Sequence, residues 1–85
     1  YSQNEIIEYN VEELPFLVEL PAWKLGDNTI RITDTSGTSY GVSLVLYDKD
    51  RSEVWSDSQS MLEYGECEFT IPITSPGDYV LEISG

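Results

Sequence analysis

The sequence predicts an all-β fold, a two-sheet antiparallel β-sandwich of about seven strands with Greek-key or immunoglobulin-like connections. Apolar and polar residues alternate at period two in short runs, at residues 42–47, 66–71 and 79–83. This alternation is typical of strands that bury one face and expose the other. Clusters of Gly, Pro, Asp and Ser separate the runs, as turns do between the short strands of a sandwich. We expect residues 1–85 to form one domain.

Three strands are expected in the first part of the chain, at residues 5–9, 16–20 and 29–33. Pro15 and Pro21 bracket the second of them, because proline interrupts a strand. The segment before Pro15 has an alternative interpretation as a short N-terminal helix, since Ile7, Val11 and Leu14 have helical spacing. Whether residues 5–14 are strand or helix stays open at this point.

Four strands are expected in the second part, at residues 42–47, 53–56, 66–71 and 79–83. Their alternation predicts a core made of Val42, Leu44, Leu46, Cys67, Phe69, Ile71, Tyr79, Leu81 and Ile83. Tyr47 is out of phase with Leu46 and is expected to point outward. Either Val54 or Trp55 must face inward after the turn, and we expect Val54 to do so.

The composition is strongly acidic, with 16 Asp and Glu residues, four Lys and Arg residues and a formal net charge of −12. Such a surface repels phosphate backbones and anionic membranes, so no nucleic-acid or membrane partner is expected. No run approaches the roughly 20 apolar residues that a membrane-spanning helix needs. Cys67 is the single cysteine, which rules out an intrachain disulfide and predicts a small buried residue. The chain begins at Tyr1, which indicates a processed product or an excised part of a longer polypeptide.

Three passages carry a resemblance to a known family: FLVELPAWKLGDNTIRIT at 16–33, VSLVLYDKDRSEVWSDS at 42–58, and EFTIPITSPGDYVLEISG at 68–85. In this order they are similar to the bacterial pre-peptidase C-terminal domain, a secreted immunoglobulin-like β-sandwich. Arg51 stands where that family usually has Gly, and Trp23 with its two successors adds bulk to a turn that is usually shorter.

The resemblance implies an extracellular or cell-surface location and a non-catalytic accessory role in a secreted bacterial protein. Such a module spaces or stabilises a larger parent polypeptide, or targets it to carbohydrate or protein. Some relatives bind calcium, but their ligands have no clear counterparts in this chain.

Candidate ligand-binding residues are aromatic side chains expected outside the core, namely Trp23, Tyr40, Tyr47, Trp55 and Tyr64. Exposed Trp and Tyr rings can form a flat platform for sugar rings or for a protein partner. The alternative is that each ring packs locally over a sheet edge.

Candidate metal ligands are Asp48 and Asp50, which alternate as ligands do at the start of a calcium loop. An EF-hand is excluded because its sixth position would be Glu53 rather than Gly and its twelfth Gln59 rather than Glu. The alternative is a polar hairpin turn, for which Asp and Ser are favoured residues. Apart from calcium, no cofactor is expected.

The chain contains no histidine, and no nucleophile–base pair or phosphate-binding loop is evident, so we do not expect an enzyme. Three functions follow from the sequence. The first is the accessory or binding module of a secreted protein. The second is a stand-alone acidic protein, an inhibitor or nucleic-acid mimic, that binds a basic partner. The third is a calcium-stabilised structural domain.

Overall fold

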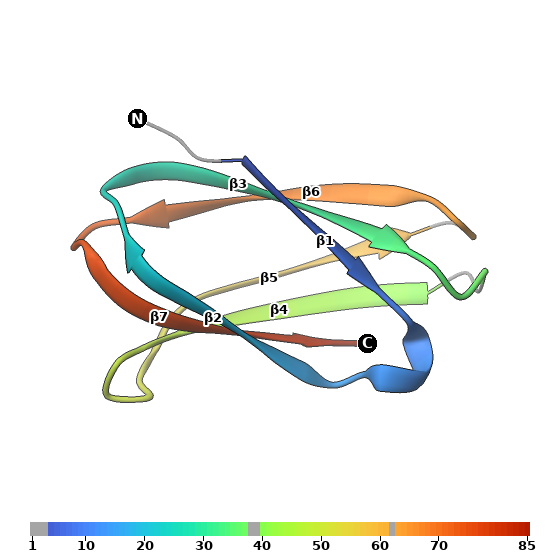
Figure 1. Cartoon of the computed structure of the whole chain (residues 1–85), viewed down its shortest axis with the longest axis horizontal. Coiled ribbons are helices and arrows are strands. Elements are labelled where there is room, and N and C mark those ends of the chain that lie inside the picture. Colours follow the sequence, from blue (N-terminus) through green and yellow to red (C-terminus); the bar gives the residue numbers. More distant parts are fainter. Residues whose placement is uncertain (1–3, 38–39, 62) are drawn as a thin grey trace.

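A computed structural model describes residues 4–37, 40–61 and 63–85, and it confirms an all-β sandwich (Figure 1). The seven strands are β1 (Asn4–Tyr9), β2 (Phe16–Trp23), β3 (Gly26–Asp34), β4 (Tyr40–Asp48), β5 (Glu53–Met61), β6 (Glu66–Ile73) and β7 (Gly77–Ser84). One sheet has the order β1-β3-β6 and the other the order β2-β7-β4-β5. In Figure 1, β3 and β6 run along the top of the view, and β4 and β7 run below them. Among the described residues, no helix is long and apolar enough to cross a membrane.

The connections between strands follow a Greek key. β4 and β5 form a hairpin, β6 lies in the other sheet beside β3, and β7 returns to pair with β4. The sheets are mainly antiparallel, as expected, and one pair departs from this pattern, because β1 runs parallel to β3. Along the chain, β2 comes between β1 and β3 and belongs to the other sheet. The chain therefore reverses twice and comes back to the first sheet in its original direction.

The N-terminal segment is a strand and not a helix. Residues 4–9 pair with residues 29–34 of β3. Helical geometry is confined to a single 3-10 turn at Val11–Glu13, where the side chain of Asn10 accepts a hydrogen bond from the Glu12 N–H. The helical spacing noted in the sequence has a different origin: Ile7 and Leu14 both pack against the core, from either side of this turn.

The core is formed by the inward-facing residues of both sheets, and all nine core residues expected from the second half of the chain are buried. β3 contributes Ile30 and Ile32, and β6 shows strict alternation of exposed and buried residues from Glu66 to Ile73. Alternation of this kind fixes the register, since a slip of one residue would turn every apolar side chain outward.

The expected orientation of Val54 and Trp55 was wrong. Val54 is 51% exposed, whereas Trp55 packs against the core and meets the Phe69 ring edge-on, with ring centroids 6.4 Å apart. The cause is a β-bulge, because Leu46 pairs with Trp55 while Tyr47 pairs with Glu53. Val54 is the additional residue in the bulge, which shifts the alternation of β5 by one position.

Trp23 was expected in a loop, but it is the last residue of β2 and is only 3% exposed. β2 continues through Pro21 because it is an edge strand, where a missing N–H is tolerated. The register shifts between Leu20 and Trp23, and Ala22 between them has a φ of 56°. This irregularity directs the indole into the core.

Two buried polar side chains hold the ends of β3. Asn28 donates from Nδ2 to the carbonyls of Lys24 and Gly26, at 3.2 and 3.1 Å, and so orders the turn before β3. At the other end, Asp34 Oδ1 accepts from the backbone N–H and the hydroxyl of Ser36, at 2.8 and 2.7 Å. Its Oδ2 accepts from the N–H of Tyr64 at 3.4 Å, which ties the β3–β4 loop to the β5–β6 turn.

Candidate functional site

A hollow of about 500 Å³ lies at the end of the sandwich where the β4–β5 and β6–β7 turns come together, and we call it the end groove. Its apolar lining comes from Val54, Pro72, Ile73, Pro76 and Tyr79. Its charged lining comes from Asp48, Lys49, Asp50 and Asp78. A concave surface that combines an apolar lining with a few polar groups is a candidate binding site.

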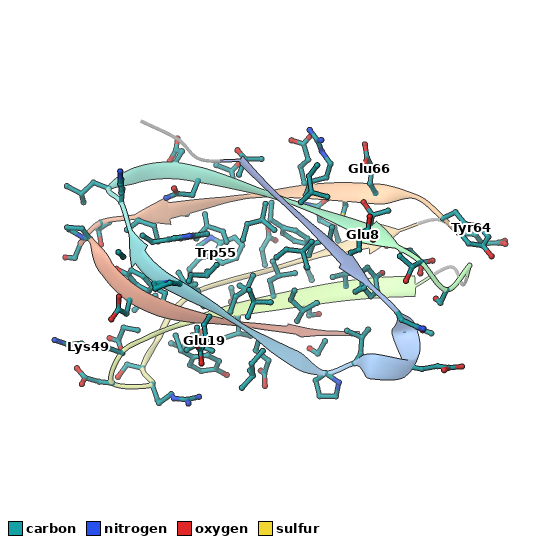
Figure 2. All side chains as sticks on the ribbon, in the orientation of Figure 1. Glu8, Glu19, Lys49, Trp55, Tyr64 and Glu66 are labelled. Atoms are coloured by element: carbon teal, nitrogen blue, oxygen red, sulfur yellow. The ribbon has the colours of Figure 1, made fainter. Side chains whose placement is uncertain are left out.

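A smaller hollow of about 160 Å³ adjoins the end groove and extends toward β2, where Glu19 and Pro21 line it. The two hollows share Lys49, Asp78 and Tyr79. Figure 2 shows Lys49 on the β4–β5 turn and Glu19 on β2. The exposed Lys49 side chain lies where the two hollows meet.

The β4–β5 turn is built around Asp48. Asp48 Oδ1 accepts from the N–H groups of Asp50 and Ser52, at 2.9 and 3.0 Å. The Asp48 carbonyl accepts from the Arg51 N–H, and the Asp48 N–H donates to the Ser52 carbonyl, both at 3.0 Å. Arg51 has a φ of 65°, a conformation that glycine adopts more readily.

These contacts account for Asp48 as the residue that organises a polar hairpin turn. In the described part of the chain, no three potential metal-ligating side chains come together in a way that could hold an ion. The turn therefore places Asp48 and Asp50 near each other. Among the described residues, no third metal-ligating side chain joins them.

The opposite wall of the end groove is held by one long-range and one local hydrogen bond. Asp78 Oδ1 accepts from the N–H of Ala22 at 2.8 Å, which links the start of β7 to the irregular end of β2. The Tyr79 hydroxyl donates to the carbonyl of Ser75 and fixes the β6–β7 turn against the ring. The groove is thus preformed, which lowers the entropy lost when a ligand binds.

The five aromatic candidates do not share one surface. Trp23 is buried in the core and Trp55 is half-buried against it, whereas Tyr64 is 71% exposed on the turn before β6, at the end of the molecule opposite Lys49 (Figure 2). Tyr47 lies on the outer face of β4, where its hydroxyl donates to Glu82 Oε1 at 3.3 Å. Tyr40 begins β4, and its side chain lies outside the described residues.

Tyr64 has a structural role in addition to its exposure. Its ring lies directly over Gly37, where an added Cβ would approach the ring to 2.5 Å. Gly37 also has a φ of 76°, in the region that favours glycine. The exposed ring therefore covers a loop, in agreement with the alternative interpretation of local packing.

Two side chains outside the end groove have perturbed acidities. Desolvation raises the pKa of the Tyr47 phenol, and the nearby carboxylates of Glu82 and Glu53 raise it further. Burial raises the pKa of the Cys67 thiol to about 11. A protonated thiol is a poor nucleophile, so Cys67 acts as a core residue.

The acidity of Cys67 predicts a specific pH dependence of stability. Because its folded pKa lies above its unfolded value, this contribution is fully present below about pH 8.5 and is lost as the pH rises through about 11. We expect the free energy of unfolding to fall less steeply over this interval in Cys67→Val than in the parent chain. Urea titrations across the interval check this, and equal slopes would show that the thiol is accessible in the folded state.

The sequence did not reveal Val54, Pro72, Ile73 and Pro76 as neighbours in one groove. The available signal was the turn chemistry around Asp48 and Pro76, combined with the pairing of β4 and β7. That pairing places Asp48 opposite Tyr79 and therefore brings both turns to the same end of the sandwich.

No family model matches the chain, and no match was found among curated proteins or among solved structures. The fold and the groove together define a small all-β sandwich domain with a preformed hollow at one end.

Proposed function

We propose that this chain is a non-catalytic binding module of a larger secreted protein, and that it holds a segment of a protein ligand in the end groove. The observation that carries this proposal is the joining of an apolar lining with three carboxylates, Asp48, Asp50 and Asp78, in one preformed hollow. The extracellular or cell-surface location and the parent polypeptide rest on the family resemblance of the three sequence passages.

A protein ligand fits this groove better than a carbohydrate. Sugar recognition uses broad aromatic faces, but Trp23 is buried in the core, and Trp55 is half-buried against it and does not line the groove. Tyr79 is the aromatic residue in the groove lining, and it is only 9% exposed. Apolar surface flanked by carboxylates suits a peptide that alternates apolar and basic side chains.

The second candidate function, a stand-alone acidic protein that binds a basic partner, is favoured by the net charge of −12. It predicts binding that weakens steeply with added salt, because the attraction would act over the whole surface. Binding by the end groove depends more on apolar contact and should weaken only modestly under the same conditions.

The test uses the ¹⁵N-labelled chain and three probes: the peptide Ac-Leu-Arg-Pro-Leu-Arg-NH2, its analogue with Glu in place of Arg, and cellohexaose. We expect the basic peptide to shift amide signals in residues 48–54 and 72–79, which include the groove lining. Shifts there caused by cellohexaose would replace the protein ligand with a carbohydrate. An absence of shifts in these segments with all three probes would overturn the proposal.

Matched variants locate the binding. Val54 and Leu17 are similarly exposed, at 51% and 54%, but only Val54 lines the groove. We expect Val54→Asp to weaken binding of the basic peptide by roughly tenfold, since a charge would replace an apolar contact. Leu17→Asp should leave the affinity unchanged, and an equal loss in both variants would point to non-specific attraction.

A further inference from the structure

The outer edge of the four-stranded sheet is open. β5 is the last strand of the order β2-β7-β4-β5, so among the described residues only one of its two edges is paired with another strand. Every residue from Ser56 to Ser60 is exposed. Among these five residues, Gln59 contacts the other sheet, since its Nε2 donates to the Glu68 carbonyl of β6 at 2.7 Å.

One hydrogen bond identifies which backbone groups face outward. The N–H of Ser58 donates to the Oδ1 of its neighbour Asp57 at 2.8 Å. Ser58 lies opposite Ser43 of β4 in a regular antiparallel register. Because backbone groups alternate in direction along a strand, Ser56 and Ser60 also direct their N–H and C=O groups away from β4.

The bulge of β5 is confined to its first residues, near Val54, whereas the other three sheet edges carry protective features of other kinds. β2 contains Pro21 and the irregular residue Ala22, which interrupt any added ladder. β6 contains Pro72, and its Glu68 carbonyl already accepts from Gln59 Nε2 at 2.7 Å. β1 is the shortest strand within the described residues, with six residues. β5 has neither a proline nor a lysine to block its edge.

We infer that the open edge of β5 binds an extended segment of a basic polypeptide, which adds to the sheet as a fifth strand. This mode of recognition gains affinity from main-chain hydrogen bonds and specificity from alternate side chains. The site is separate from the end groove. Its open groups are those of Ser56, Ser58 and Ser60, which do not line that groove.

Charge determines the occupant. Residues 53–61 contain Glu53 and Asp57 and no basic residue, and the whole chain carries a net charge of −12. A second copy of the chain would bring like charges against this edge, which disfavours self-association. A lysine or arginine of an incoming strand would instead pair with Asp57 and free the Ser58 N–H for the new ladder.

The experiment uses the ¹⁵N-labelled chain and the peptide Ac-Thr-Lys-Thr-Lys-Thr-Lys-NH2, which lacks the apolar side chains that the end groove would bind. We expect the amides of Ser56, Ser58 and Ser60 to shift and to become protected from hydrogen exchange. Two N-methylated peptides, one modified at the Thr and one at the Lys positions, serve as internal controls. One of them should bind roughly tenfold more weakly, because only one set of N–H groups faces β5.

Two charge variants complete the test. Asp57→Asn keeps an acceptor for the Ser58 N–H and removes the charge, so the lysine peptide should bind roughly threefold to fivefold more weakly. Glu66→Gln, an exposed change on β6, should leave binding unchanged. Equal effects of the two N-methylated peptides would overturn the proposal, as would shifts confined to residues 72–79 or self-association without peptide. If the end groove failed to bind the leucine–arginine peptide, the shifts expected at residues 56–60 with the lysine peptide would be unaffected. The two proposals can therefore fail separately.

Discussion

Replacing Trp23 with alanine is expected to lower the free energy of unfolding by about 3–5 kcal/mol. The indole is 3% exposed and belongs to the core cluster, so its removal would leave a large cavity beside β7, where Trp23 pairs with Gly77. The same residue was a sequence-based candidate for binding a ligand at the surface. The two roles predict opposite results, which makes this substitution decisive.

Urea denaturation of Trp23→Ala beside Tyr64→Ala measures the difference. Tyr64 is 71% exposed, and its loss should cost no more than about 1 kcal/mol, even though its ring covers Gly37. If the two variants were equally stable, Trp23 would have to lie at the surface, and the end of β2 would differ from the strand described above.

Leu81→Ala is expected to cost about 2–5 kcal/mol. Leu81 is fully buried in β7 and pairs with Val18 of β2 on one side and Leu46 of β4 on the other, at the centre of the four-stranded sheet. Thermal or urea unfolding checks the loss. Leu17→Ala is the matched control, because Leu17 is 54% exposed on the neighbouring strand and should change stability by less than about 1 kcal/mol.

A loss below about 1 kcal/mol for Leu81→Ala would contradict the register of β7. Because side chains alternate between the two faces, such a result would mean that Val80 and Glu82 face the core in place of Leu81. It would also break the hydrogen bond between Tyr47 and Glu82 on the outer face.

The strands and most of the core could be predicted from the sequence because period-two alternation is a local signal. The prediction from alternation failed where neighbouring residues fitted more than one register. Val54 and Trp55 are adjacent and both apolar, so alternation alone could not locate the bulge that turns Trp55 inward. Pro21 indicated the end of a strand, yet β2 continues beyond it, because proline is tolerated on an edge strand.

Features that depend on long-range topology were beyond local pattern analysis. The parallel pairing of β1 with β3 depends on how the chain changes sheets, which no short segment encodes. The same applies to the end groove, whose lining comes from turns that are far apart in sequence. Asp48 was recognised as a turn residue because its chemistry is local, and its hydrogen bonds agree with that interpretation.

The loops at the two ends of the molecule differ in how independently they could be redesigned. Asp34 and the Gly37–Tyr64 contact fasten two loops to each other, so an insertion in either one would have to be accommodated by both. In the part of the chain that the structure describes, the hydrogen bonds that shape the β4–β5 turn join residues 48–52 to one another. A peptide grafted into that turn would leave the sandwich intact and would replace one wall of the groove. It is therefore the natural position for a randomised library that aims to give this domain a new specificity.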